Sequence, residues 1–375
     1  MGTLNQEEDD FDGTVMGAGA RGIFYRAKAC LKEIESVAAG LVHGRKKIDR
    51  LRVDCFGFSR GAAAARFLLH LMLRSKIGLI ANLRDGGIEV GAFEIPFVGL
   101  FDTGAHYFDN FENDTEEIHL DDIGEDHVMR VVQLAAGDEN RYNFPLANIA
   151  SAGARGKQYF LPGVHADVGG CYNNLSTVDQ IEDLVLFEVP TGRINDEETI
   201  QLCRERCNAI RRELVELGWY PEEDITTIER DDSVVLLLYA FKYFAVVAKR
   251  RGISNTYSYL PLQIMADKAG KGETKLTFKL QEYSYERNSP LNDIQLAVEH
   301  NSHDDQFRLY NKWDKIRLLR RGFLHFSSHY TPRAVVLRPN QPQFHRAEAA
   351  GTENEWNNSD IDLMTERRRR RIFPG

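Results

Sequence analysis

The fold of this chain is decided by residues 51–65, which read Leu51-Arg52-Val53-Asp54-Cys55-Phe56-Gly57-Phe58-Ser59-Arg60-Gly61-Ala62-Ala63-Ala64-Ala65. A short apolar strand runs up to Gly57, and a helix of small residues follows Gly61. Glycines at these two positions allow a sharp strand-to-helix turn, because side chains there would collide with the strand or the helix. The pattern predicts that Ser59 is a nucleophile and that the Arg60 backbone N–H points at the oxyanion formed after attack. The alternative is a tight turn without chemistry, in which Arg60 is structural.

Three more apolar segments indicate strands, at residues 95–101, 128–135 and 158–161. An amphipathic helix is expected over 24–42, ahead of the elbow strand. Strands that alternate with helices are typical of a mostly parallel sheet, so the predicted fold class is α/β. We expect one domain over residues 1–375.

A serine nucleophile needs a base, and the base needs a carboxylate that orients it. Asp102 stands directly after the segment 95–101, and His165 stands in the glycine-bounded loop after 158–161. The chain order of serine, aspartate and histidine is that of α/β-hydrolases. The sequence therefore predicts an α/β-hydrolase-like triad of Ser59, Asp102 and His165. The Asp-Thr-Gly sequence is also good turn chemistry, which leaves a turn or helix cap as the alternative for Asp102.

Other residues compete for these roles. Asp167 is a rival for the acid. His325 and His329 are rivals for the base, although neither follows a clear strand. Gly19 lies in a Gly-x-Gly-x-x-Gly pattern of the dinucleotide-binding type, but the acidic residues before it do not form a strand. We interpret this segment as a loop in which Gly19 donates a backbone N–H beside the nucleophile.

Composition narrows the classes of function. The 375 residues are 43% hydrophobic, which is enough for a substantial core, and the net charge of −9 disfavours a nucleic-acid partner. Five scattered cysteines are typical of a protein that folds in a reducing compartment. The predicted chemistry requires no metal or cofactor. No secretory signal is visible, and the most apolar run, 234–248, is too short for a membrane span and indicates a buried helix.

The second half of the chain has a more helical and more charged pattern. We expect a mainly helical insertion over residues 178–320 that forms a cleft or lid. A C-terminal segment over 340–375 carries the arginine run 367–371, which we interpret as a solvated tail.

Three motifs lie in order along the chain: Gly57-Phe58-Ser59-Arg60-Gly61-Ala62-Ala63-Ala64-Ala65-Arg66, Gly99-Leu100-Phe101-Asp102-Thr103, and Pro162-Gly163-Val164-His165-Ala166-Asp167-Val168-Gly169-Gly170. With lesser matches at 138–145 and 259–262, they resemble the type VI secretion lipase effectors of the first Tle class, which belong to a wider α/β-hydrolase family. The resemblance covers nearly the whole chain. It implies a phospholipase that hydrolyses acyl esters of glycerophospholipids, with Ser59, Asp102 and His165 as its catalytic residues.

The resemblance also implies partners and a location. It implies an antibacterial toxin that stays in the bacterial cytoplasm before delivery, reaches the target-cell periplasm on a VgrG-type spike protein, and is restrained in kin by an immunity protein. Family members usually have an N-terminal strand with a Phe-Asp-Gly-Thr-like turn well upstream of the elbow, whereas about 50 residues precede the elbow strand here. We therefore expect a sheet that lacks its first strand. The alternatives to a phospholipase are a carboxylesterase of non-lipid esters and a truncated, inactive remnant that only binds a partner.

Overall fold

A computed structural model of the chain describes residues 22–42, 46–74, 76–104, 119–120, 123, 127–139, 141, 144–174, 181–188, 196–234, 239–271, 276–286, 289–300, 313–327 and 372–373. The helices are α1 (Ile23–Leu41), α2 (Arg60–Leu73), α3 (Leu79–Asp85), α4 (His165–Gly169), α5 (Glu197–Glu216), α6 (Tyr259–Gly270), α7 (Pro290–His300) and α8 (Trp313–Gly322). Short 3₁₀ helices lie at Ala150–Arg155, Glu222–Asp224 and Asn255–Ser258. The strands are β1 (Lys47–Arg52), β2 (Cys55–Phe58), β3 (Glu89–Glu94), β4 (Val98–Phe101), β5 (Val131–Ala136), β6 (Leu146–Ala147), β7 (Gly156–Leu161), β8 (Ile181–Glu188), β9 (Ile225–Val234), β10 (Tyr239–Arg250) and β11 (Ile372–Phe373).

The central sheet has four parallel strands in the order β2-β4-β5-β7. A second parallel pair, β1 with β3, continues its ladder, because Val53 N–H donates to Glu94 O and Cys55 N–H donates to Phe97 O. The predicted mostly parallel α/β-hydrolase-like sheet is thus confirmed. Within the described ranges β2 and β7 are the two edge strands of the four. Residues 1–21, which contain Gly19 and Phe11-Asp12-Gly13-Thr14, lie outside those ranges, so the missing first strand stays a prediction.

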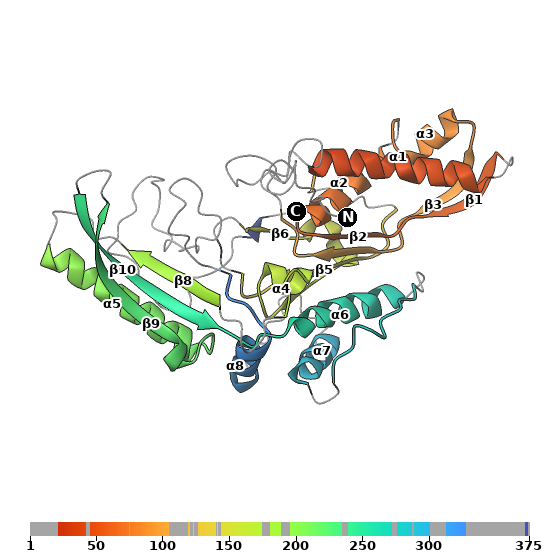
Figure 1. Ribbon diagram of the computed structural model, residues 1–375. Coiled ribbons are helices and arrows are strands. Elements are labelled where there is room, and N and C mark those ends of the chain that lie inside the picture. The colour runs from red at the N-terminus through yellow and green to blue at the C-terminus, as the bar shows by residue number, and fades with distance from the viewer. Residues whose placement is uncertain are drawn as a thin grey trace.

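Helices cover both faces of the central sheet (Figure 1). On one face α1, α2 and α3 bury apolar side chains against β2 and β4. Ala62 to Ala65 in α2 are fully buried, and their small size lets this helix lie close to the strands. On the other face α4 and α6 pack against β5 and β7 in a second cluster, which extends to α5. None of the described helices is both long and apolar enough to span a bilayer.

Residues 181–250 differ from the helical insertion that the sequence predicts. Here β8, β10 and β9 form an antiparallel sheet, with α5 lying along it at the left of Figure 1. The run 234–248, expected to be a buried helix, belongs mainly to β10. Its aromatic and β-branched residues suit a strand, and pairing with β9 over ten residues satisfies its backbone groups. Helical structure does follow in α6, α7 and α8, whereas the role of this segment as cleft or lid stays a prediction.

The contact between β2 and α2 is too close for a side chain at Gly57. A Cβ there would lie 2.7 Å from Ala62 Cα and would overlap the backbone carbonyl of Gly61. Both obstacles are backbone atoms, which cannot move away by a rotamer change. The sharp turn at Ser59 therefore depends on glycine at position 57.

We predict that Gly57→Ala lowers the free energy of unfolding by about 1–3 kcal/mol, because strand and helix must separate. The matched control is Gly40→Ala in α1, where an added Cβ meets no atom within 4 Å. That control should leave stability unchanged or raise it by up to about 1 kcal/mol. Chemical denaturation of the two variants measures both effects, and equal free-energy changes would contradict the packing argument.

Candidate active site

Ser59 occupies the turn between β2 and α2. Its backbone φ is 56°, a left-handed value that is rare for a residue with a side chain. The turn is held by the Ser59 N–H, which donates to Phe101 O at 2.9 Å, and by Ser59 O, which accepts from Ala62 N–H at 2.9 Å. The backbone conformation at Ser59 is the strained one expected of a nucleophile elbow.

Asp102 lies beside Ser59, at the carboxyl end of β4. It is fully buried and also has a positive φ, of 50°. Its N–H donates to Leu134 O at 2.8 Å, and its Oδ1 accepts from Ala136 N–H at 2.7 Å. One carboxylate oxygen is thus held by the neighbouring strand β5, and the other is left to meet a side chain.

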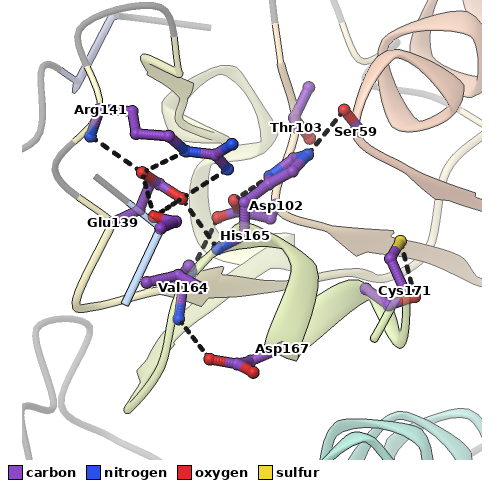
Figure 2. A network of polar contacts seen from close by, with 12 residues as sticks. Ser59, Asp102, Thr103, Glu139, Arg141, Val164, His165, Asp167 and Cys171 are labelled. Carbon is purple, nitrogen blue, oxygen red and sulfur yellow. Dashed lines mark hydrogen bonds and ion pairs between the residues drawn. The ribbon is translucent and has the colours of Figure 1, made fainter. Parts of the chain in front are cut away.

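His165 joins these two residues (Figure 2). Its Nδ1 lies 2.5 Å from Asp102 Oδ2, and its Nε2 lies 2.8 Å from Ser59 Oγ. An ionised carboxylate has no proton to donate, so the neutral imidazole donates to Asp102 from Nδ1. Its Nε2 then carries no proton and accepts from the serine hydroxyl. The structure therefore brings together the three residues that the sequence predicts for the triad, in the linked order of hydroxyl, imidazole and carboxylate.

Two aromatic rings confine the imidazole. The Phe58 ring centroid lies 4.6 Å from that of His165, and the Phe144 ring meets it edge-on at 5.1 Å. Phe58 is itself held in place by Gly169 at the end of α4, where a Cβ would overlap the Phe58 ring. These contacts leave His165 buried, with 6% of its surface exposed. The imidazole is thus shielded from water on its ring faces.

Asp167 and His325, the alternative candidates for the acid and the base, are hydrogen-bonded to each other. Asp167 Oδ1 lies 2.7 Å from His325 Nδ1, and Asp167 Oδ2 accepts from the backbone N–H groups of Val164 at 3.0 Å and His325 at 3.1 Å. Burial raises the pKa of the Asp167 carboxyl. The Tyr172 ring stacks on His325 at 3.7 Å. Neither residue is bonded to Ser59 or His165 in the described hydrogen bonds, and His329 lies outside the described residues.

Arg60 is the first residue of α2, directly after Ser59. The first N–H groups of a helix have no partner within it, so the Arg60 N–H and the helix N-terminus are suited to a developing negative charge. Its half-buried guanidinium has a pKa lowered to about 10 by burial, and it remains charged at neutral pH. None of the described carboxylates pairs with it. Arg60 thus adds a cationic side chain to the residue that directly follows the candidate nucleophile.

The sequence alone indicated no role for Asp138 and Glu139, which bind the backbone of the loop that carries His165. Asp138 and Glu139 follow β5 after Gly137, and both accept hydrogen bonds from this loop. Arg320 and Ser327 bind the same two carboxylates from the far end of the chain. Their position in the sequence could have indicated this role, because acidic residues just after a central strand lie at the same sheet edge as Ser59 and Asp102.

Neither a family model nor a curated protein matches the sequence. Among solved structures, the chain is similar to a Tle1 effector bound to the VgrG spike from the type 6 secretion system, with a TM-score of 0.58 and 19% identity over 89% of this chain and 72% of that chain. A crystal structure of an uncharacterized protein from Pseudomonas aeruginosa is 27% identical over 39% of this chain and 24% of that chain, with a TM-score of 0.26. The first of these similarities shows that this chain shares the α/β-hydrolase-like fold of a Tle1 effector.

Proposed function

We propose that this chain is a serine hydrolase that cleaves acyl esters of glycerophospholipids. The observation that carries the proposal is the row of hydrogen bonds from Ser59 Oγ to His165 Nε2 at 2.8 Å, and from His165 Nδ1 to Asp102 Oδ2 at 2.5 Å. The row starts at a serine in a positive-φ elbow, at a helix N-terminus. The hydrogen-bonded row is the arrangement that nucleophilic catalysis of acyl transfer uses, and the elbow with its helix N-terminus is the form that it takes in α/β-hydrolases.

The proposed reaction has two halves. In the first, Ser59 Oγ attacks the ester carbonyl carbon while its proton passes to His165 Nε2, and the Arg60 N–H donates to the oxyanion. The bond to the alcohol then breaks, and the imidazolium returns the proton to the leaving oxygen. In the second half, water attacks the acyl-serine while His165 takes its proton, the bond to Ser59 Oγ breaks to release the fatty acid, and the imidazolium returns the proton to Oγ. Asp102 keeps the Nδ1 proton in place and stabilises the imidazolium. We also propose, from the sequence alone, that the backbone N–H of Gly19 is the second donor to the oxyanion.

The phospholipid substrate has two supports. The three sequence motifs resemble those of the type VI lipase effectors, and the fold is similar to that of a Tle1 effector. The charge at Arg60 also suits a substrate with an anion close to its ester, because the phosphodiester of a glycerophospholipid is a few bonds from both acyl esters. By the same resemblance we propose that the protein is an antibacterial effector, loaded on a VgrG-type spike, delivered into the target-cell periplasm and neutralised in kin by an immunity protein.

We predict that Ser59→Ala lowers kcat on p-nitrophenyl butyrate and on phosphatidylglycerol micelles by roughly 10⁴-fold or more, because the nucleophile is lost. A fluorophosphonate probe should label the wild type at one site, mapped to Ser59 by peptide mass spectrometry, and should leave the variant unlabelled. The matched control is Ser284→Ala at an exposed serine, which should retain wild-type rates and labelling. Equal hydrolysis by wild type and Ser59→Ala would contradict the role of Ser59 as nucleophile, and no hydrolysis above background by either protein would favour a protein that only binds a partner.

Arg60→Met tests the substrate class, because the substitution removes the guanidinium and keeps the backbone N–H. We expect kcat/KM to fall about 10-fold on phosphatidylglycerol and to change less than about 2-fold on diacylglycerol with the same acyl chains, since a charge-assisted hydrogen bond contributes about 1.5–3 kcal/mol. The exposed Arg84→Gln is the control for general loss of positive charge. Equal losses on both lipids would refute a role in phosphate binding. Faster turnover of short soluble esters than of either lipid would favour a non-lipid carboxylesterase.

A further inference from the structure

Three successive backbone N–H groups lead into His165, and each donates to a different buried carboxylate. Gly163 N–H donates to Asp138 Oδ2 at 2.7 Å, Val164 N–H to Asp167 Oδ2 at 3.0 Å, and His165 N–H to Glu139 Oε2 at 3.1 Å. The last two bonds are drawn in Figure 2. We call Asp138, Glu139 and Asp167 the carboxylate clamp.

Each member of the clamp also binds one side chain from residues 320–327. Arg320 Nη2 donates to Asp138 Oδ1 at 2.7 Å, His325 Nδ1 lies 2.7 Å from Asp167 Oδ1, and Ser327 Oγ donates to Glu139 Oε1 at 3.2 Å. The clamp therefore ties the loop that carries His165 to a segment more than 150 residues later in the chain. All three carboxylates and all three partners are buried. Such repeated bridging leaves the loop little freedom to shift.

Glu139 is the member that acts on His165 directly. Its carboxylate also forms a bidentate ion pair with Arg141, whose Nε lies 3.0 Å from Oε1 and whose Nη2 lies 2.9 Å from Oε2. The Arg141 guanidinium in turn lies 3.3 Å from the centre of the Phe144 ring, which packs against the imidazole of His165. Glu139 thus holds the backbone of His165 by one bond and its ring through Arg141 and Phe144.

The position of this backbone decides the position of the base. His165 is the first residue of α4, a helix of five residues, so its N–H has no acceptor within the helix. The preceding Gly163 has a φ of 99°, a conformation that other residues rarely adopt, and the loop turns sharply there. A shift of about 1 Å at this point would move Nε2 away from Ser59 or Nδ1 away from Asp102, and misplacement on that scale can lower turnover by roughly 100-fold.

A role in stability alone explains these contacts less well. Burial of a charged pair costs desolvation, and apolar residues of similar volume often stabilise a fold as much or more. Here the fully buried Glu139 accepts a hydrogen bond from the backbone N–H of His165, the candidate base. That placement serves the geometry of the site.

We propose that Glu139 is a positioning residue of this hydrolase, which acts through the backbone of His165 to keep its imidazole between Asp102 and Ser59. The inference rests on the proposed serine hydrolase function. It assigns Glu139 no contact with the substrate and no part in proton transfer.

The test is Glu139→Gln, which keeps the size of the side chain but turns one acceptor into a donor that faces other donors. On p-nitrophenyl butyrate we expect kcat to fall about 10- to 100-fold with KM within about 2-fold. A fluorophosphonate probe should still label nearly every molecule at Ser59, only more slowly. The exposed Glu205→Gln makes the same chemical change outside the site and should leave all three quantities unchanged.

Two results would overturn the proposal. One is a Glu139→Gln variant with wild-type kcat. The other is a loss of activity fully explained by a smaller labelled fraction, with normal kcat for each labelled molecule, which is the signature of a purely structural role. If Glu139→Gln does not fold, Arg141→Lys tests the proposal instead, because it keeps the positive charge but cannot form the bidentate contact with Glu139. It should lower kcat about 3- to 10-fold at full labelling, and a wild-type kcat refutes the proposal. Wild-type activity in Ser59→Ala would instead mean that the proposed function itself had failed.

Discussion

Parallel pairing across β2, β4 and β5 is the constraint on which the candidate site depends. Phe58 pairs with Phe101, and Phe101 pairs with Leu134, so the chain leaves β2 and β4 at the same level of the sheet. Ser59 and Asp102 are the next residues along these two strands, and the last ladder bonds, to Phe101 O and Leu134 O, hold both at positive φ. Strained backbone of this kind persists only where surrounding structure dictates it. Hydrogen bonds within the sheet thus stabilise the strained backbone conformations of Ser59 and Asp102.

The parts of this arrangement that depend on local signals could be predicted from the sequence. An apolar run that ends at Gly57 and a small-residue helix after Gly61 indicate the elbow, and the structure has both. Proximity of Asp102 to the elbow follows from one further rule, that carboxyl ends of parallel strands share an edge. His165 follows β7, the fourth strand of that sheet, and the same rule places it there. The structure brings the three side chains within hydrogen-bonding distance, and their catalytic roles stay a prediction.

The parts that depend on pairing between distant segments could not be predicted. The apolar run in β10 has no local feature that separates a buried helix from a strand, and its pairing with β9 and β8 decides the matter. The partner of Asp167 is His325, 158 residues away, and no local pattern links the two. The match over 138–145 gave Glu139 no role either, because an acidic residue after a strand is common and its bonds to the distant residues His165 and Ser327 appear only in the fold.

The charges around the site also form a consistent arrangement. Asp102 is matched by His165 and the Ala136 N–H, Asp138 by Arg320, Glu139 by Arg141, and Asp167 by His325. The charges of Asp138 and Glu139 are offset by arginines, whereas Asp102 keeps its negative charge and is stabilised by hydrogen bonds. Arg60 is different, since burial lowers its pKa and none of the described carboxylates pairs with it. In the proposed reaction, the Arg60 N–H and the N-terminus of α2 stabilise the negative oxygen that forms when Ser59 attacks an ester. The proposed reaction thus develops negative charge at the positive end of a helix, while the carboxylates on the His165 side already have hydrogen-bond donors.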